Sequence, residues 1–457
     1  MNIIICGAGR VGYSISNQLS KQGHSITVID KVSADIQKIN DNLDARGVVG
    51  IATYPSVLEK ADAKNADMII AVTRNDETNM IVCQIAHSLF SIPRKIARIR
   101  SKEFLKPIWK GLFTKTNLPI DIIISPEYEV SKSLLRKLEA PGALESFPFS
   151  KDLVRLLEIN IDEKCPVINT PLQKLTEIFS DLNANVLGVH REEKFIKFKK
   201  NNQLLKNDKA LILTDSNQVD RTLSIFGKDE KFAKKILIIG GGNIGFDLAK
   251  LLEENPNQPR IKIIEKDSVR AQSIANDLNE AIVVKGDGLD ENILKEINID
   301  EIDTVLTTTD DDEVNVMSAM LCKKKGIKRT IAISNSHNYN LLQSSLKIDD
   351  IVDPRMTTVS TILKHVHKGK IESVYSLDDG EYEIIEAKIS ENSELLNKKI
   401  LDINFGDDIR IGLIVRDKKV IVPKKEIDFK INDTVILIAS RDKLKKVEQL
   451  FRISQYY

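Results

Sequence analysis

Two glycine-rich stretches, far apart in the chain, constrain the fold more than any other feature of the sequence. The chain begins MNIIICGAGRVG, and KILIIGGGNIG begins at Lys235. In each stretch a short apolar run rich in isoleucine leads into Gly-x-Gly-x-x-Gly, and a pattern typical of a helix follows. This order of strand, glycine turn and helix predicts the dinucleotide-binding turn of a parallel α/β sheet, present twice.

Other segments repeat at nearly the same spacing. AVTRNDETN, which ends at Asn79, matches TTTDDDEVN, which ends at Asn315. IISPEYEVSKSLL, which begins at Ile123, matches IVDPRMTTVSTIL, which begins at Ile351. The glycine motifs and these two segments occur in the same order in both halves of the chain. The sequence therefore predicts an internal duplication with small loop insertions.

Each half divides again into a larger and a smaller part. In the larger part, short β-rich runs alternate with helical stretches, which indicates βαβ units and a parallel sheet. After EAPGALES in the first half, the pattern changes to short strands with hairpins around LLEINI, VLGVHR, FIKFKK and KALILT. After HKGKIES in the second half, the corresponding runs are EIIEAKI, IRIGLIVR, KVIVP and DTVILIA. We therefore expect an α/β protein with two doubly wound parallel-sheet Rossmann domains, each followed by a small mixed α/β domain. The expected bounds are 1–124, 144–228, 233–351 and 371–455.

The residues of the first glycine motif suit a bound pyrophosphate. Gly7 allows the tight turn, Gly9 lets a phosphate approach the backbone, and Gly12 lets the helix pack closely on the strand. Asp30 ends the next strand, SITVID, where a carboxylate accepts from both ribose hydroxyls and repels a 2′-phosphate. This combination predicts an NAD(H) site that disfavours NADP(H). The alternative is a glycine turn in a sheet that binds no nucleotide.

The second motif, GGGNIG, has the same layout but a different set of charges. Glu265 ends the strand IKIIE and has a longer reach than Asp30 toward a ribose diol. Arg98 in KIARIR, a candidate phosphate or adenine contact, aligns with Ala332 in RTIAIS. We therefore expect the second site to lack this guanidinium, and its ligand stays open.

Charge and motif content exclude several classes of function. The formal net charge is +1, so no global field favours nucleic acid or anionic lipid. No apolar run approaches the roughly 20 residues that span a bilayer, and direct membrane insertion is not expected. No Walker lysine, GxSxG or HExxH motif is present, and we assign no catalytic residue and no metal ligand. Tyr128 and Lys132 spell the YxxxK of short-chain dehydrogenases, but their segment is typical of a helix that leaves the sheet. An NAD-dependent oxidoreductase with tandem Rossmann domains remains the alternative to a non-enzyme.

Seven segments carry a resemblance to a known family: ICGAGRVG, ITVID, AVTRNDETNMIVCQIAHSLF, RKIARIRS, LIIGGGNIG, DDDEVNVMSAML and IGLIVRDKKVIVP. Across essentially its whole length the chain resembles the TrkA family, the tandem RCK (KTN) regulatory subunits of bacterial Trk potassium-uptake systems. The resemblance implies RCK N-terminal and C-terminal domains in tandem. GIATYP in the first half departs from the family's usual Gly-Asp, which the second half keeps at Gly286-Asp287, so a different loop is expected beside the adenine.

The family's role implies a function and a location. Such subunits form a ring, expected here to be a homotetramer, beneath a Trk-type potassium-conducting membrane subunit. The chain would be peripheral, on the cytoplasmic face of the bacterial inner membrane, and NAD⁺ or NADH would gate the pore by changing the shape of the ring. ATP and ADP are expected as competing regulatory ligands.

The same resemblance assigns cofactor-binding roles in both halves. The residues assigned in the first half are Gly7, Ala8, Gly9, Arg10, Val11, Gly12, Asp30, Thr73, Arg74 and Arg98. Those assigned in the second half are Gly240, Gly241, Gly242, Asn243, Ile244, Gly245, Glu265, Thr309 and Asp310.

Overall fold

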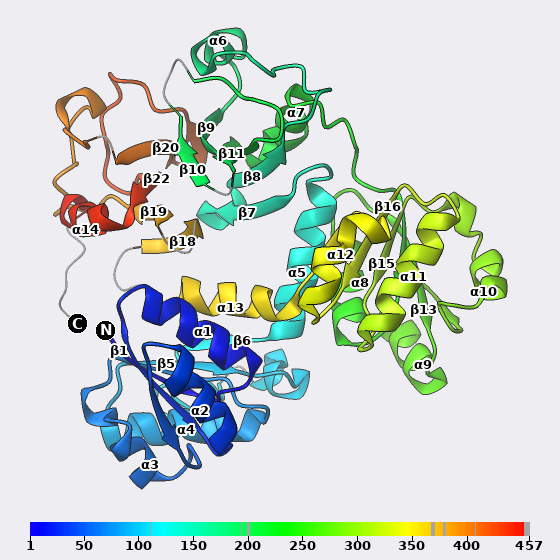
Figure 1. The fold of residues 1–457 in the computed structure, drawn as a ribbon, viewed down its shortest axis with the longest axis horizontal. Coiled ribbons are helices and arrows are strands. Elements are labelled where there is room, and N and C mark those ends of the chain that lie inside the picture. Colours follow the sequence, from blue (N-terminus) through cyan, green and yellow to red (C-terminus); the bar gives the residue numbers. More distant parts are fainter. Residues whose placement is uncertain are drawn as a thin grey trace. The chain divides into compact units, whose positions relative to one another are not determined.

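A computed structural model describes residues 1–109, 111–192, 194–198, 202–366, 371–377, 381–406 and 408–451. The chain forms two compact units (Figure 1). The first comprises Met1–Leu135 and Ala233–Leu363, and the second comprises Arg136–Phe232 and Lys364–Tyr457. Each half of the duplication therefore contributes its larger domain to the first unit and its smaller domain to the second.

The first unit contains two six-stranded parallel sheets, with strand orders β3-β2-β1-β4-β5-β6 and β14-β13-β12-β15-β16-β17. The strands of the first sheet are β1 (Asn2–Cys6), β2 (Ser25–Asp30), β3 (Arg46–Val49), β4 (Met68–Ala71), β5 (Arg94–Arg98) and β6 (Ile122–Ile124). Those of the second are β12 (Lys235–Ile239), β13 (Arg260–Glu265), β14 (Ile282–Lys285), β15 (Thr304–Thr307), β16 (Arg329–Ile333) and β17 (Asp350–Val352). Both orders are those of a doubly wound Rossmann sheet, as the sequence predicts.

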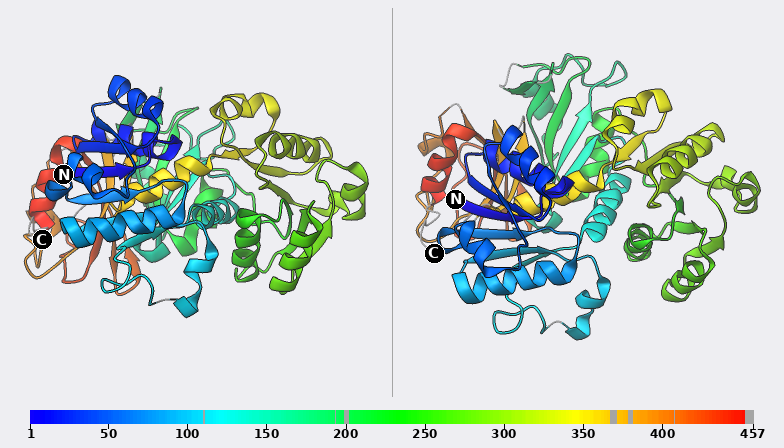
Figure 2. Two further views of the ribbon diagram at one scale, coloured as in Figure 1. Left: turned by 90° about the horizontal axis from the view of Figure 1, so that it is seen from below. Right: turned by 60° about the horizontal axis from the view of Figure 1, so that its bottom comes forward.

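Helices cover both faces of these sheets, as Figure 2 shows for the first domain in blue. The first domain contains α1 (Arg10–Lys21), α2 (Ser33–Asn42), α3 (Pro55–Lys60), α4 (Asp76–Phe90) and α5 (Pro126–Glu139). The second contains α8 (Asn243–Glu253), α9 (Ser268–Asp277), α10 (Glu291–Glu296), α11 (Asp312–Lys324), α12 (His337–Leu346) and α13 (Pro354–Lys364). Because both faces are covered, the central strand β1 consists mainly of apolar residues, and its Ile3, Ile4 and Ile5 are all buried.

Each small domain of the second unit is built on a five-stranded antiparallel sheet, with orders β10-β9-β11-β8-β7 and β18-β19-β22-β20-β21. The first sheet contains β7 (Glu145–Phe149), β8 (Val154–Asn160), β9 (Ala184–Arg191), β10 (Lys194–Lys197) and β11 (Lys209–Asp215). The second contains β18 (Ile371–Leu377), β19 (Tyr382–Lys388), β20 (Ile409–Arg416), β21 (Lys419–Ile421) and β22 (Thr434–Ser440). The helices of these domains are α6 (Leu172–Ile178), α7 (Val219–Ile225) and α14 (Leu444–Phe451). The predicted mixed α/β character is confirmed, but the sequence reading missed the edge strands β7 and β18.

The two small domains share one apolar core, and repeat-related residues meet in it. Phe147 of β7 and Tyr375 of β18 stand at equivalent positions, and their ring centroids are 4.9 Å apart. Arg410 donates through Nη2 to Oδ1 of Asn185, its counterpart on β9, at 2.8 Å. Side chains related by the duplication therefore face each other, and each pair has diverged into two different residues.

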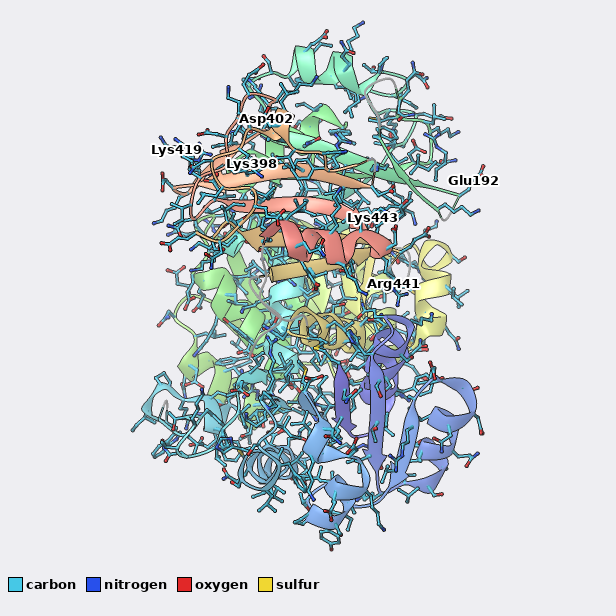
Figure 3. All side chains as sticks on the ribbon, turned by 90° about the vertical axis from the view of Figure 1, so that its left-hand side faces the viewer. Glu192, Lys398, Asp402, Lys419, Arg441 and Lys443 are labelled. Atoms are coloured by element: carbon cyan, nitrogen blue, oxygen red, sulfur yellow. The ribbon has the colours of Figure 1, made fainter. Side chains whose placement is uncertain are left out.

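Glu383 on β19 is one of the buried carboxyl groups of the second small domain, and it is 3% exposed. Burial raises the pKa of Glu383 from 4.5 to about 7, Arg441 opposes the rise, and Glu448 of α14 adds to it. Figure 3 shows Arg441 at the end of β22. A carboxyl group with a raised pKa binds its proton more tightly in the folded state. Its contribution to stability is therefore present at acidic pH and decreases as the pH rises through about 7.

We expect Glu383→Gln to remove this pH dependence, because the amide does not titrate. In wild type, ionisation of Glu383 should lower the free energy of unfolding by up to about 3 kcal/mol between pH 5 and pH 8. Urea unfolding of both chains at the two pH values measures the difference. An identical pH dependence in wild type and variant would contradict the assignment.

Candidate nucleotide-binding sites

The first glycine turn is fixed by contacts that leave no room for a side chain at two of its positions. Gly7 has a φ of +117°, and its N–H donates to the Ile29 carbonyl at 2.8 Å. A Cβ on Gly12 would lie 1.8 Å from the carbonyl oxygen of Gly7. The helix therefore starts directly against the end of β1. At the corresponding place, a Cβ on Gly245 would lie 2.0 Å from the Gly240 oxygen.

The middle glycine of each turn lies in a different environment. Gly9 and Gly242 are the N-caps of α1 and α8, and neither helix receives a capping hydrogen bond from a side chain of the described part of the chain. A Cβ on either glycine would meet nothing within 4 Å. By contrast, α4 begins on Asn75, whose side chain accepts from the Thr78 N–H. The first turns of α1 and α8 therefore present uncapped N–H groups to open space, which suits a phosphate.

A carboxylate at the end of the neighbouring strand fastens each glycine loop. Asp30 accepts from the Ala8 N–H at 2.7 Å through Oδ2 and from the Val32 N–H at 2.9 Å through Oδ1. Glu265 accepts in the same way from the N–H groups of Gly241 and Asp267, at 2.7 and 2.8 Å. Each carboxylate oxygen keeps a further lone pair, which can accept from a ribose hydroxyl.

A buried asparagine, which the sequence reading did not assign, connects two strand ends in each domain. Asn79 accepts through Oδ1 from the N–H and the hydroxyl of Thr73, at 2.9 and 2.7 Å, and donates to the Arg98 carbonyl at 2.9 Å. Asn315 makes the equivalent bonds to Thr309 and to the Ile333 carbonyl. Both asparagines occupy the last position of the matched segments AVTRNDETN and TTTDDDEVN. This repetition is the feature of the sequence from which their role could have been suspected.

The strand register corrects one alignment. Ala97 pairs with Ala71 in the first sheet, and Ala332 pairs with Thr307 in the second. The residue equivalent to Arg98 is therefore Ile333, and Ala332 corresponds to Ala97. The alignment with Ala332 was wrong by one residue: the segment 312–328, which contains α11 and its connection to β16, is one residue shorter than the corresponding segment 76–93 of the first domain. The second site still lacks the arginine, because Ile333 is a buried apolar residue.

Arg98 lies where an anionic ligand would stabilise it. It is the last residue of β5, and its Nε is buried without a hydrogen-bond partner among the described residues. Burial lowers the pKa of Arg98, and the neighbouring cations Arg100 and Arg74 lower it further, against Glu127 and Asp76. A guanidinium in such a position gains from a phosphate that would supply both charge and hydrogen-bond acceptors.

The second site carries different charges around a similar loop. Asp310 is exposed at the position that Arg74 holds in the first domain. Arg270 of α9 donates through Nε to the Gly241 carbonyl at 2.8 Å, and the Thr308 hydroxyl donates to the Gly240 carbonyl at 2.8 Å. Beside the loop, Asp287 pairs with Lys266 at 2.9 Å, where the first domain has Ile51, which is 42% exposed. The two cradles therefore share a backbone but differ in the groups around them.

The YxxxK pair of short-chain dehydrogenases does not lie on either glycine loop. Tyr128 and Lys132 are on α5, the Lys132 ammonium stacks 4.3 Å from the Tyr128 ring centroid, and burial raises the pKa of Tyr128. Within the described ranges, no group of three histidine, cysteine or acidic residues is arranged to hold a metal ion. None of the described helices combines the length and apolar character needed to cross a membrane.

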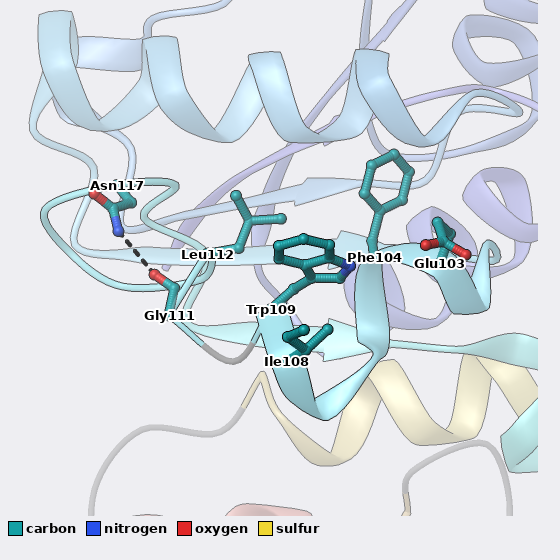
Figure 4. A pocket seen from close by; sticks show the side chains of 7 residues that line it. All are labelled: Glu103, Phe104, Ile108, Trp109, Gly111, Leu112 and Asn117. Atoms are coloured by element: carbon teal, nitrogen blue, oxygen red, sulfur yellow. Dashed lines mark hydrogen bonds between the residues drawn. The ribbon is translucent and has the colours of Figure 1, made fainter.

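The cavity in Figure 4, of about 540 Å³, does not coincide with either glycine loop. It lies in the connection between β5 and β6, which contains the short 3-10 helices η2 (Lys102–Leu105) and η3 (Pro107–Trp109). Its wall is mostly apolar and includes Phe104, Trp109 and Leu112. This cavity therefore does not indicate where a nucleotide would bind.

Together, the fold and these loops define a tandem Rossmann protein with two dinucleotide-type cradles. The family model of the TrkA-N domain matches residues 3–126 and 236–354, and that of the TrkA-C domain matches 156–227 and 384–452. The Trk system potassium uptake protein TrkA of Azorhizobium caulinodans is 42% identical over 454 residues, 99% of each chain. That of Vibrio alginolyticus is 34% identical over all of both chains. The chain therefore belongs to the TrkA family of Trk potassium-uptake proteins.

Solved structures agree in fold. The RCK domain of GsuK covers 99% of this chain and 95% of its own, with a TM-score of 0.59 and 18% identity. The GsuK channel bound to NAD covers 99% of this chain and 79% of its own, with a TM-score of 0.60 and 18% identity. At this level of identity the similarity establishes the RCK architecture.

The steric difference between two positions of one loop can be tested. We expect Gly12→Ala to lower the free energy of unfolding by at least about 1–3 kcal/mol, because its Cβ overlaps the Gly7 carbonyl. Gly9→Ser should change it by less than about 0.5 kcal/mol, because a serine suits an N-cap and its Cβ meets open space. Thermal unfolding of both variants measures the difference, and equal midpoints would be inconsistent with the described turn.

Proposed function

We propose that this chain is a nucleotide-dependent regulatory subunit of a Trk-type potassium-uptake system and is not an enzyme. It would form a homotetrameric ring on the cytoplasmic face of the bacterial inner membrane, beneath a potassium-conducting membrane subunit. The observation that carries the proposal is the pair of uncapped glycine cradles, each beside a strand-end carboxylate, in a member of the TrkA family. We propose that its four domains span residues 1–124, 144–228, 233–351 and 371–455.

The first cradle is proposed to bind NAD⁺ or NADH. The pyrophosphate would lie on the N–H groups of the Gly7–Gly12 loop and the start of α1, with Arg98 and Arg74 as cationic partners. Asp30 would accept from the hydroxyls of the ribose and disfavour a 2′-phosphate. A nucleotide in this cradle would give the buried Nε of Arg98 an acceptor within reach.

The second cradle is proposed to bind a nucleotide through the loop from Gly240 to Gly245, with Glu265 on the ribose. Thr309 and Asp310 would lie beside the ligand, as Thr73 and Arg74 would in the first cradle. Because Asp310 and Ile333 replace two arginines, we expect weaker binding of polyanionic ligands here. ATP and ADP are proposed as ligands that compete with NAD(H).

The output of binding is proposed to be a change of conformation. A ligand can shift a conformational equilibrium only by its difference in affinity for the two states. NAD⁺ and NADH differ by a charge on the nicotinamide ring, and ATP and ADP differ by a phosphate, so each pair could be distinguished. A tandem-Rossmann oxidoreductase, the alternative, would instead consume NADH in the presence of a substrate.

The role of Asp30 can be tested by calorimetry. We expect Asp30→Ala to weaken NADH binding at the first site by roughly 10- to 150-fold, because a charge-assisted contact contributes about 1.5–3 kcal/mol. The same variant should reduce the preference for NADH over NADPH. Glu265→Ala is the matched change in the second cradle, and thermal unfolding checks both variants. An unchanged NADH affinity in Asp30→Ala would refute the assigned role.

The gating role can be tested by potassium flux through a reconstituted Trk-type membrane subunit. We expect NADH to change the flux with wild type and to have little effect with Gly9→Asp, whose carboxylate would cap α1 and repel phosphate. Gly242→Asp, the matched change in the second cradle, should reduce the NADH response less, since the second site lacks the counterpart of Arg98. If wild type and Gly9→Asp respond equally to saturating NADH, the proposal fails.

A further inference from the structure

The second glycine cradle is held in part by residues of the first Rossmann domain. The hydroxyl of Ser131 on α5 shares its hydrogen between the Ile244 carbonyl, in the first turn of α8, at 2.8 Å and the Glu127 carbonyl of its own helix at 2.9 Å. Lys102, which follows β5, donates to Asp247 Oδ1 at 2.6 Å, and its ammonium lies 4.5 Å from the ring centroid of Phe246. All of these residues belong to the first compact unit. The helix that would receive the second ligand's phosphate is therefore positioned from outside its own domain.

These contacts continue to the glycine loop itself. The Phe246 ring also lies 5.3 Å from the guanidinium carbon of Arg270, whose Nε donates to the Gly241 carbonyl at 2.8 Å. Lys102 and Arg270 therefore share one aromatic ring. Movement of Lys102 would alter both the start of α8 and the group that orients the Gly241 peptide.

The ion pair between Lys102 and Asp247 is nearly buried on the side of the carboxylate. The Asp247 side chain is 12% exposed, and its second oxygen is buried without a hydrogen-bond partner among the described residues. Burial raises the pKa of Asp247, and Lys102 acts against this rise. Loss of Lys102 would leave a nearly buried carboxylate without its hydrogen-bonded counter-ion, with Lys250 as the other cation that acts on it, and this loss is costly.

The same segment reaches the first cradle. Lys102 lies four residues after Arg98, the arginine at the carboxyl end of β5. Between them, the N–H groups of Arg100 and Ser101 donate to one oxygen of Asp76, the first residue of α4, at 2.9 and 2.8 Å. The segment from Arg98 to Lys102 therefore connects the rim of the first cradle to the helix of the second.

The equivalent positions of the other repeat lack the residues that make these contacts. The residue equivalent to Ser131 is Val359 of α13, which has no hydroxyl to donate. The residue equivalent to Asp247 is Ser14, whose hydroxyl donates to the Arg10 carbonyl within its own helix. The contacts of Lys102 and Ser131 with α8 are therefore specific to the second cradle and do not follow from the repeat itself.

We propose that Lys102 and Ser131 are positioning residues for the second cradle, and that through them nucleotide binding at the two sites is thermodynamically linked. The inference rests on the proposed nucleotide binding. A ligand on Arg98 would fix the segment that ends at Lys102 and thereby change the affinity of the second cradle. Linkage is reciprocal, so a ligand at the second site would change the affinity of the first by the same factor.

The test is calorimetric titration of the full chain with NADH. In wild type, the second site is measured with the first site filled; in Gly9→Asp, it is measured with the first site blocked. We expect the two dissociation constants of the second site to differ by about 5- to 150-fold. In the Lys102→Met background the same ratio should fall to within about twofold of one. Ser131→Ala should also bring the ratio closer to one. Lys102→Arg, which keeps the positive charge, should give a ratio close to that of wild type.

Lys106→Met is the control, because it removes an exposed ion pair with Glu103 in the same connection and should leave the ratio unchanged. A ratio of one in wild type, a ratio that survives Lys102→Met, or a second site that never binds NADH would overturn the inference while leaving first-site binding intact. Absence of NADH binding at both sites of wild type would instead overturn the proposed function, and this inference with it.

Discussion

A single interaction, from a strand-end carboxylate to a glycine-loop N–H, organises both halves of this molecule. The bonds from Ala8 to Asp30 and from Gly241 to Glu265, each 2.7 Å long, join the ends of adjacent parallel strands at the point where each glycine turn begins its helix. The turn must be glycine-rich because the helix starts against the strand. The same carboxylate keeps lone pairs that can accept from a ribose hydroxyl, so one group shapes the loop and, in the proposed function, would also hold the ligand. The rest of each domain supports this geometry.

Duplication has preserved that geometry while the surroundings diverged. Arg74 and Arg98 in the first domain correspond to Asp310 and Ile333 in the second, so the second cradle lacks two cationic groups of the first. In the second unit, Asn185 and Arg410 have become different and now bond to each other. A fused pair of unlike halves can make contacts that identical halves could not, because equal charges placed face to face would repel. In the proposed function, two unlike sites in one chain would let the protein respond to more than one ligand.

The sequence alone predicted the duplication, the doubly wound sheets and the position of both glycine turns, because these depend on local patterns of apolar residues and glycine. It missed β7 and β18, which are edge strands: Pro148 interrupts the pattern of the first, as proline is tolerated at an edge. It misaligned Arg98 because register depends on loop length, which only pairing between strands resolves. Asn79 and Asn315 were visible as repeated residues, but their role depends on contacts between distant strand ends. The contacts of Lys102 and Ser131 with α8 join residues more than 100 positions apart and have no local signature.

In the proposed function, nucleotide binding changes the shape of the protein without chemical conversion of the nucleotide. Small-angle X-ray scattering of the full chain with saturating NAD⁺, with saturating NADH and without nucleotide tests this most directly, with NADH absorbance followed in the same samples. We expect the scattering profile of at least one nucleotide complex to differ from that of the free protein, and the NADH absorbance to stay constant. Identical profiles for the free protein and both complexes, with binding verified by calorimetry, or a steady loss of NADH would contradict the proposed function.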